Sequence, residues 1–484
     1  MIFNSLIFAI FLPTVFLLYW FVFNKNLKLQ NLLIVIVSYF FYGWWDWRFL
    51  SLLFFSSVID FLVGLFLEKS NNPTNRKLLL SISIIGNLGL LGFFKYYNFF
   101  VDSFIEAGAK LGFTFHESTL NIILPVGISF YTFQTLSYGI DVYRRQLATT
   151  KDFVSFMAFV SFFPQLVAGP IERASNLLPQ FEKKREFDLE KAKDGLRQML
   201  WGLIKKVVIA DTLAIEVDRI FSSSSYENLP GISLAIGSIF FVFQIYCDFS
   251  GYSDIGIGTA RLFGFDLMRN FAYPFFSRNI GEFWQRWHIS LSTWFRDYVF
   301  IPLGGNRGTK YFIIRNILFT YILSGLWHGA NWTYIIWGVL NGLFYLPLIF
   351  MQKRNRKYSE IVAFDRNLPS IKELLQIIIT FMLFTFSMIF FRSENLSRSL
   401  DYFYFMISNL TLNSTIIIDW ILSKSFIIII ILIIVEWIQR KKQHAMAFDN
   451  FPKTIRWSLY FTALIIFFYF GEFEQSFQFI YFQF

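Results

Sequence analysis

Long apolar stretches dominate this chain of 484 residues and restrict it to a fold embedded in a membrane. A helix needs about 20 apolar residues to cross a hydrocarbon core of about 30 Å. Four stretches reach or approach that length: Ile2–Phe23, Leu78–Phe100, Ile371–Phe391 and Ser425–Trp437. The chain is 55% hydrophobic and contains 66 Phe, which is more apolar surface than a soluble domain can bury. We predict an all-α polytopic membrane protein with about ten to twelve transmembrane helices.

The charged residues predict the orientation of these helices. Basic side chains gather in short loops, which the positive-inside rule places in the cytoplasm. They are Lys25, Lys28, Lys69, Arg76, Lys77, Lys353, Arg354, Arg356, Lys357, Arg440, Lys441 and Lys442. The N-terminus is then extracytoplasmic, and a last span at about Ile455–Phe470 leaves the tail outside as well. The excess of 43 Lys and Arg over 33 Asp and Glu reflects this orientation, so nucleic-acid binding is not expected.

The first segment and the cysteine content exclude two other readings. Residues 1–22 have no basic stretch before the apolar run, and the run is too long for a signal peptide. We therefore expect a retained first helix. Cys247 is the single cysteine, which excludes an intrachain disulfide framework and a multi-cysteine metal site. No metal site is predicted.

Interruptions of the apolar pattern divide one transmembrane domain, residues 1–484, into regions. We predict N-terminal spans in 1–104, a catalytic core with broken helices in 105–345, C-terminal spans in 346–470 and an outward-facing aromatic tail in 471–484. In the core, Pro125, Gly127, Pro164 and Pro170 interrupt hydrophobic segments, and proline breaks helices. Broken helices at membrane depth require protein or a water-filled cavity around them, which predicts a central tunnel. Simple turns between spans are the alternative.

A dense run of charges occupies residues 182–193. We interpret it as a solvated cytoplasmic helix that leads into Leu196–Ala210. A surface that docks an anionic donor or an acidic carrier protein is the alternative.

His328 is the first candidate for chemistry, because the chain has only four histidines and this one lies within apolar segments. An ionisable group at membrane depth is costly, and it indicates a functional site. Gly325 and Gly329 flank it and allow another group to approach closely. A satisfied packing residue is the alternative for a lone buried histidine.

A second histidine, His288, lies in a segment whose spacing predicts one helix across residues 283–297. An amphipathic helix in the membrane interface would explain the tryptophans and arginines of this segment, but it does not require an imidazole. Upstream, Asp248 and Asp254 adjoin an apolar span, so they should face the protein and pair. Arg286 is a candidate partner. A purely structural role for both acids is the alternative.

Acyl transfer with histidine as the base fits these residues best. A histidine base accelerates proton transfer by typically 10²–10⁴-fold. The sequence has no GxSxG elbow, no phosphate-cradling loop and no HExxH. A transporter or flippase for a polysaccharide or lipid precursor is the rival class, because broken helices and intramembrane charges are also typical of transporters. A scaffold that recruits an extracytoplasmic acetyltransferase is a third class.

Five stretches resemble the membrane-bound O-acyltransferase (MBOAT) family, in particular its bacterial branch for alginate O-acetylation. They are PVGISFYTFQTLSYGIDVYR (125–144), FFPQLVAGPIER (162–173), GYSDIGIGTARLFGF (251–265), RNIGEFWQRWHISLSTWFRDYVFIPLGGN (278–306) and SGLWHGANWTYIIWG (324–338). The resemblance implies an MBOAT-type helical bundle around a tunnel. It also implies that His328 is the catalytic histidine and that His288 positions or polarises the acyl group. Candidates for substrate contact or tunnel lining are Arg286, Trp287, Trp327, Asn331, Asp254 and Ser324.

The resemblance further implies a donor, an acceptor and partners. The donor is acetyl-CoA or another acyl thioester on the cytoplasmic side, with no bound cofactor. The acceptor is an extracytoplasmic polysaccharide such as alginate, cellulose or peptidoglycan. The expected partners are an extracytoplasmic SGNH-type acetyltransferase, the polysaccharide export machinery and the lipid bilayer. The expected location is the bacterial plasma (inner) membrane.

The tail ends in FIYFQF (479–484) and is similar to the C-terminal motif of a small partner peptide in teichoic-acid D-alanylation. This resemblance implies that Tyr481 carries the acyl group. An aromatic anchor at the membrane interface is the alternative reading.

Overall fold

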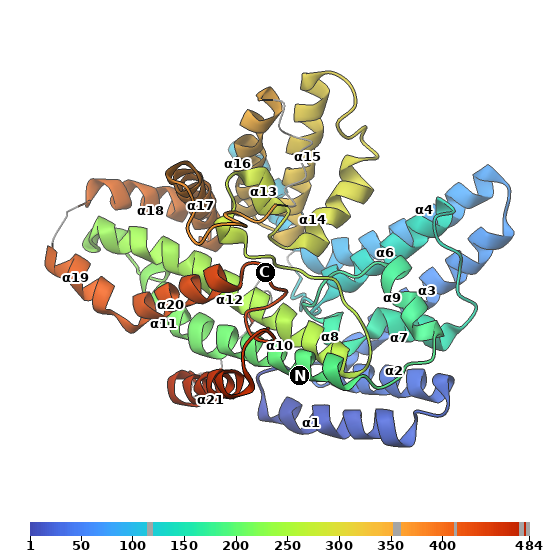
Figure 1. The fold of residues 1–484 in the computed structure, drawn as a ribbon. Helices are drawn as coiled ribbons and strands as arrows, with labels where there is room; N and C mark the ends of the chain where they lie inside the picture. Colours follow the sequence, from blue (N-terminus) through green and yellow to red (C-terminus); the bar gives the residue numbers. More distant parts are fainter. Residues whose placement is uncertain (114–119, 352–359, 411–413, 474–478, 481–484) are drawn as a thin grey trace. The chain divides into compact units, whose positions relative to one another are not determined.

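The computed structural model describes residues 1–113, 120–351, 360–410, 414–473 and 479–480, and their regular structure is helical throughout (Figure 1). The prediction of an all-α fold is confirmed. The described chain forms two compact units. Unit 1 comprises residues 1–195 and 259–268, and unit 2 comprises residues 196–258 and 269–484.

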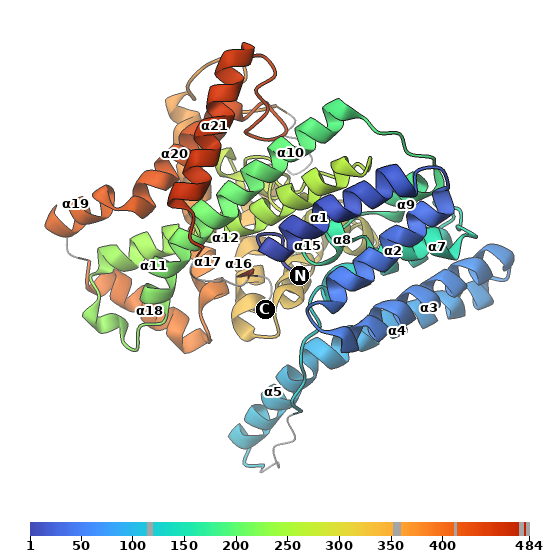
Figure 2. The ribbon, with the colours of Figure 1, turned by 90° about the horizontal axis from the view of Figure 1, so that it is seen from below.

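Unit 1 is built from helices α1 to α9 and the first part of α10. Their bounds are α1 (Leu6–Leu17), η1 (Leu18–Val22), α2 (Leu27–Gly43), η2 (Trp47–Phe49), α3 (Leu50–Lys69), α4 (Pro73–Leu91), η3 (Gly92–Tyr96), α5 (Tyr97–Lys110), α6 (Ile128–Tyr143), α7 (Phe153–Ser161), α8 (Phe163–Leu166), α9 (Ala174–Glu182) and α10 (Leu189–Leu203). Helices α3 and α4 pack side by side, and both contact α6. Figure 2 shows α5 continuing from α4 and projecting away from the other helices of this unit.

A buried polar network joins α3, α4 and α6. Asp60 on α3 accepts hydrogen bonds from Ser83 and, at 2.7 Å, from the amide of Asn87, both on α4. Thr135 on α6 donates to the Asn87 side chain at 3.1 Å. A buried carboxylate is costly unless it is hydrogen-bonded, and these partners satisfy it. The network therefore fixes the register of the three helices.

The two predicted interruptions lie at the starts of helices. Gly127 adopts φ +76° at the start of α6, and a Cβ there would lie 2.8 Å from the carbonyl oxygen of Leu166. Only glycine allows this close approach at a positive φ. Phe162 separates α7 from α8, and Pro164 stands in the first turn of α8. These interruptions do not distinguish a central tunnel from simple turns between spans, so the tunnel stays a prediction.

The charged run at 182–193 is only partly the predicted helix. α9 ends at Glu182 and α10 begins at Leu189, so residues 183–188 are not helical. Arg185 is buried rather than solvated, and its guanidinium donates to Gln30 at 2.9 Å and Asn31 at 2.6 Å on α2. A guanidinium has five donors and can link several acceptors, which explains why this loop folds inward.

Unit 2 contains the rest of the helices. Their bounds are the end of α10, η4 (Ile204–Ala210), α11 (Asp211–Phe221), η5 (Tyr226–Asn228), α12 (Gly231–Leu262, up to Gly258), η6 (Pro274–Phe276), α13 (Ile280–Trp284), α14 (Ile289–Phe295), η7 (Arg296–Phe300), α15 (Lys310–His328), α16 (Trp332–Phe350), α17 (Ile371–Arg392), α18 (Leu396–Ser408), α19 (Ser414–Leu422), α20 (Lys424–Gln439) and α21 (Lys453–Phe470). Helices α15 and α16 form an antiparallel pair that is visible in Figure 1, and α17 packs on α16.

Side-chain caps explain where several of these helices begin. Asn331 accepts from the main chain of Thr333 at the start of α16. Ser370 and Glu373 form a reciprocal capping box at the start of α17. Each cap satisfies a main-chain N–H that has no partner within its helix, typically worth about 1 kcal/mol.

Among the described residues, five helices are long and apolar enough to cross a membrane. They are Trp47–Lys69, Pro73–Lys110, Gly231–Leu262, Trp332–Phe350 and Ile371–Arg392. A sixth span arises if α19 and α20, bent by 60°, count as one. This number is below the predicted ten to twelve, because stretches such as Leu6–Val22 and Leu27–Gly43 fold as shorter helices. The multi-pass character is confirmed.

Candidate active site around two buried histidines

His288 lies at a break between two short helices. α13 ends at Trp284 and α14 begins at Ile289, with His288 in the left-handed region at φ 42° and ψ 55°. The prediction of one helix across residues 283–297 is therefore wrong. Asn270 supports the break, because its carbonyl oxygen accepts from the N–H of Ile289 at 2.9 Å. Helical spacing cannot report such a contact with a distant residue.

The side chain of Asn270 determines which nitrogen of His288 carries a proton. Its Oδ1 accepts from the N–H of Ser290 at 3.3 Å and from the Ser290 hydroxyl at 2.9 Å, while its Nδ2 donates to Ser253 at 3.1 Å. Because Oδ1 can only accept, Nδ1 of His288, at 3.1 Å, is the donor. The lone pair of the neutral ring is then on Nε2.

Burial favours that neutral ring. His288 is 1% exposed, and the edge of its ring meets Phe249, with ring centroids 4.6 Å apart. This desolvation lowers the pKa of His288 below its ordinary value of 6.5, because an apolar environment disfavours the charged imidazolium. His288 is therefore a neutral hydrogen-bond acceptor at Nε2 around neutral pH.

His328 is the last residue of α15 and is also buried. Three aromatic rings surround it edge-on, with centroids at 5.0 Å for Trp327, 5.0 Å for Trp337 and 5.2 Å for Phe391. The helix ends directly after it, where the N–H of Gly329 donates to the carbonyl of Gly325 at 3.3 Å. The helix end and the three rings together fix the position of the imidazole.

The structure brings the two histidines to one place. The ring of Trp327 lies 6.1 Å from that of His288 and 5.0 Å from that of His328, measured between centroids. Ser324, one turn before His328 on the same helix, is buried as well. Trp327 therefore adjoins both histidines, and a substrate contact by Trp327 or Ser324 stays a prediction.

Two other predicted residues have structural partners. Trp287 is buried in a cluster of aromatic rings: Tyr246, Phe271, Phe283 and Phe384. Asn331 caps α16 and donates to the carbonyl of Glu394 at 2.8 Å. Packing and capping account for both positions, so a substrate contact by either stays a prediction.

The expected pairing of Arg286 with the acids of α12 is wrong. Arg286 pairs with Glu282 one turn before it at 2.9 Å. Asp254 instead binds Lys205 at 2.6 Å, and Asp248 binds Lys206 at 2.8 Å. Both lysines lie on η4, between α10 and α11. In the sequence analysis these positions were only part of the apolar stretch Leu196–Ala210.

The tail reaches this region through its last two described residues. Phe479 and Ile480 are buried, and the N–H of Ile480 donates to Oδ2 of Asp248 at 2.7 Å. The ring of Phe479 lies 4.7 Å from that of Tyr252 and 6.0 Å from that of Phe249. Tyr481 lies outside the described residues.

Sequence reasoning missed Asn270 and Lys206. Asn270 stands in a loop without a recognisable motif, so no pattern in the sequence indicates its role. Lys206 gave a better signal, because paired lysines within the apolar stretch Leu196–Ala210 require acidic partners. The carboxylates of Asp248 and Asp254 were such partners.

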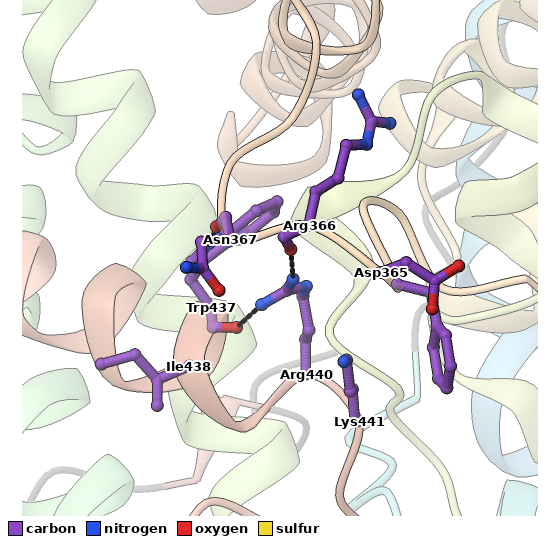
Figure 3. Close-up of a pocket in the computed structure, with 8 residues that line it drawn as sticks. Asp365, Arg366, Asn367, Trp437, Ile438, Arg440 and Lys441 are labelled. Atoms are coloured by element: carbon purple, nitrogen blue, oxygen red, sulfur yellow. Dashed lines mark hydrogen bonds between the residues drawn. The ribbon is translucent and has the colours of Figure 1, made fainter.

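A separate cavity of about 480 Å³ lies beside the end of α20 (Figure 3). Its lining residues are Phe364, Asp365, Arg366, Asn367, Trp437, Ile438, Arg440 and Lys441. Arg440 donates to the main-chain carbonyls of Trp437 and Arg366 at 2.7 Å each, as Figure 3 shows. Arg366 also pairs with Glu373 at 2.7 Å. Arg366 and Arg440 are thus already paired with acceptors of the protein itself, so we infer that they stabilise the loop.

The fold and the candidate site define a multi-pass, all-α membrane protein in which two buried imidazoles adjoin one tryptophan. Residues 144–393, more than half of the chain, match the MBOAT, membrane-bound O-acyltransferase family. The chain belongs to this family. The matched range contains Asn270, His288 and His328, and it ends before the tail.

Relatives with three different names are similar in sequence over much of the chain. It is 42% identical over 400 residues to a "Probable alginate O-acetylase AlgI" of Pseudomonas syringae pv. tomato, covering 82% of this chain and 73% of the relative. It is 36% identical over 430 residues to a "Peptidoglycan O-acetyltransferase" of Helicobacter pylori, covering 83% and 78%. It is 29% identical over 294 residues to a "Teichoic acid D-alanyltransferase" of Bacillus subtilis, covering 58% and 71%.

Proposed function

We propose that this O-acyltransferase moves acetyl groups from a cytoplasmic acyl thioester, such as acetyl-CoA, to the outer face for O-acetylation of a polysaccharide. The observation that carries the proposal is the contact of Trp327 with both buried histidines. Relatives named for alginate and peptidoglycan O-acetylation support acetyl as the group and a polysaccharide as the acceptor. The rival readings as a transporter or a scaffold lack support, since the chain belongs to an acyltransferase family.

The hydrogen bond of His288 to Asn270 supports a proton-accepting role for His288. A ring that donates through Nδ1 presents a lone pair at Nε2, which can take a proton but cannot polarise an acyl oxygen. We therefore propose His288 as a proton acceptor in place of the polarising role that the resemblance implied. His328 remains the second imidazole, acting as a base or as a shuttle for the proton.

Tyr481 is the proposed acyl carrier. Its phenol oxygen would attack the thioester carbonyl carbon while an imidazole accepts the phenol proton. The carbon–sulfur bond then breaks, the thiolate leaves and takes up the proton, and the acetyl group remains as a tyrosyl ester. A hydroxyl of the acceptor, or of a partner transferase, would next displace the phenol. The burial of Phe479 and Ile480 beside Phe249 supports a tail that enters the protein rather than an anchor in the interface.

The location and partners implied by the family resemblance are part of the same proposal. We place the protein in a bacterial plasma membrane with both termini extracytoplasmic. The partners are an extracytoplasmic SGNH-type acetyltransferase and the polysaccharide export machinery. Arg286, Trp287, Asn331 and Asp254 are proposed to support the tunnel around the histidines through the contacts described above.

Substitution of His328 tests the assignment. His328→Ala should abolish polymer acetylation while the protein remains in the membrane at the normal level. His288→Gln should reduce acetylation by at least about a hundredfold, since a histidine base contributes typically 10²–10⁴-fold. His444→Gln, which removes a buried imidazole from the loop between α20 and α21, is the matched control. Wild-type acetylation by His328→Ala would refute the mechanism.

Purified protein in proteoliposomes separates enzyme from transporter. With labelled acetyl-CoA outside, label should become bound to the protein in the wild type and not in Tyr481→Phe, which keeps the ring but removes the nucleophile. An acetyl adduct on the tail peptide should be detected by mass spectrometry. Movement of intact acetyl-CoA into the vesicles would favour the transporter, and normal acetylation by Tyr481→Phe would leave the tail as an anchor.

A further inference from the structure

A buried carboxylate binds the main chain of the tail. Oδ2 of Asp248, on α12, accepts from the N–H of Ile480 at 2.7 Å, and both residues are less than 5% exposed. A hydrogen bond between an N–H and a carboxylate is about twice as strong as one between neutral groups. A tail that only floats on the membrane surface would not require such an acceptor inside the protein.

The other oxygen of the same carboxylate holds a lysine. Nζ of Lys206, on η4, lies 2.8 Å from Oδ1 of Asp248 and 2.7 Å from Oδ1 of Asp211. All three side chains are buried, at 8% exposure or less. Although burial acts against the charged amine, the two acids together raise the pKa of Lys206, so it stays protonated.

Such a buried cluster is not needed for stability alone. Desolvating the charges costs several kcal/mol per ion, and apolar residues of equal volume often stabilise a protein as well or better. Its retention is therefore better explained by a specific geometry. That geometry leaves Oδ2 of Asp248 directed at the tail.

The beginning of the tail is bound to η4, the helix that carries Lys206. The N–H of Glu472 donates to the carbonyl of Val207, next to Lys206, at 3.1 Å. The Glu472 carboxylate also pairs with Lys424 at 2.8 Å. Two described parts of the tail are thus attached to helices of unit 2, Glu472 next to Lys206 and Ile480 at Asp248.

The attachment at Ile480 continues to the histidine site. Phe479 packs on Phe249, whose ring in turn meets the ring of His288 at 4.6 Å. We propose that Lys206 and Asp248 form a tail clamp, a pair of positioning residues that holds Phe479 and Ile480 of the tail against Phe249, the neighbour of His288. This inference rests on the proposed relay for its purpose, but docking itself can be measured independently.

The test measures how accessible the end of the tail is in full-length protein reconstituted into lipid vesicles. Gln483→Cys provides a label site for a membrane-permeant maleimide, and the parent protein with only the buried Cys247 provides the background. Ile480→Pro removes the N–H that Asp248 accepts while leaving the buried cluster intact. Ile480→Val keeps this N–H and is the matched control.

Three further variants address the clamp from the protein side. Asp248→Asn replaces one oxygen by an NH₂ group, which then faces either the Lys206 amine or the Ile480 N–H. Lys206→Met removes the cation, and Lys206→Arg restores one as a rescue. We expect labelling at position 483 to become about tenfold faster in Ile480→Pro, Asp248→Asn and Lys206→Met, as the loss of a charge-assisted hydrogen bond implies. Ile480→Val and Lys206→Arg should label close to the parent rate.

The outcomes separate the clamp from the relay. Unchanged labelling in both Ile480→Pro and Asp248→Asn would overturn the clamp, as would equal acceleration in Ile480→Val. Faster labelling together with at least about tenfold slower acetylation supports a positioning role. Faster labelling with unchanged acetylation overturns that role. If the clamp variants label faster while Tyr481→Phe acetylates normally, the clamp stands and the relay fails.

Discussion

At the residue scale, the candidate site depends on a loop asparagine. Asn270 supports the helix break at His288 with its main chain and sets the tautomer of the imidazole with its side chain. Its other contacts, to Ser253 and Ser290, hold its own amide in one orientation. A change at Asn270 should therefore affect proton transfer through His288 without touching the imidazole.

The buried imidazole of His288 should make stability depend on pH. Its folded pKa lies below the unfolded value of 6.5, so the unfolded state binds the proton more readily below that pH. Stability from this residue is complete above pH 6.5 and falls by about 1.4 kcal/mol for each pH unit below it, until the folded pKa is reached. Thermal unfolding in detergent at pH 7.5 and 5.5 measures this loss.

His288→Gln is the comparison for that measurement, because glutamine is polar but does not titrate. The melting temperature of the variant should fall less between pH 7.5 and 5.5 than that of the wild type. An equal fall in both proteins would mean that other groups cause the acid sensitivity.

At the scale of elements, glycines set the approach of the helices that carry the site. A Cβ on Gly325 of α15 would lie 2.2 Å from the carbonyl oxygen of Tyr334 on α16, and one on Gly338 would lie 2.4 Å from that of Tyr321. Both obstacles are main-chain atoms, so the helices themselves would have to move. Gly325 and Gly338 thus admit a neighbouring helix, whereas from the sequence we expected the glycines beside His328 to admit a group close to the imidazole.

Gly325→Ala should therefore separate α15 from α16 and displace His328. We expect a loss of about 1–3 kcal/mol in stability, as is typical of overpacking, and a clear loss of acetylation. Gly89→Ala on α4 is the matched control, because a Cβ there meets nothing within 4 Å. That substitution should be neutral or stabilising by up to about 1 kcal/mol. Similar melting temperatures for the two variants would contradict this account of the packing.

At the scale of the whole molecule, the basic loops predict how the chain crosses the membrane. Alkaline phosphatase fused after Phe484 should be active, since this enzyme folds only outside the cytoplasm. The same reporter inserted after Lys441 should be inactive, because the loop at 440–442 carries three basic residues. Activity of the second fusion and inactivity of the first would invert the topology and with it the direction of acyl transfer.

The sequence by itself determined the fold class and the family, and it indicated the two histidines as candidates. Apolar stretches of membrane-spanning length permit few folds other than a helical bundle, because lipid offers no partner to main-chain groups. The motifs around His288 and His328 are contiguous in sequence, so they can be recognised without knowing the fold. Gly127 and Pro164 likewise stand at helix starts, since the effect of glycine and proline on the main chain is local.

Only the tertiary structure decided the partners of these residues. Arg286 pairs with Glu282, Asp248 with Lys206 and His288 with Asn270. Most of these contacts join residues far apart in the chain, and helical periodicity carries no information about which faces of two distant helices meet. The break at His288 follows the same rule, because hydrogen bonds to Asn270 override the local helical pattern of residues 283–297. Long-range hydrogen bonds therefore set the geometry of the candidate site, whereas the local motifs had indicated only which residues belong to it.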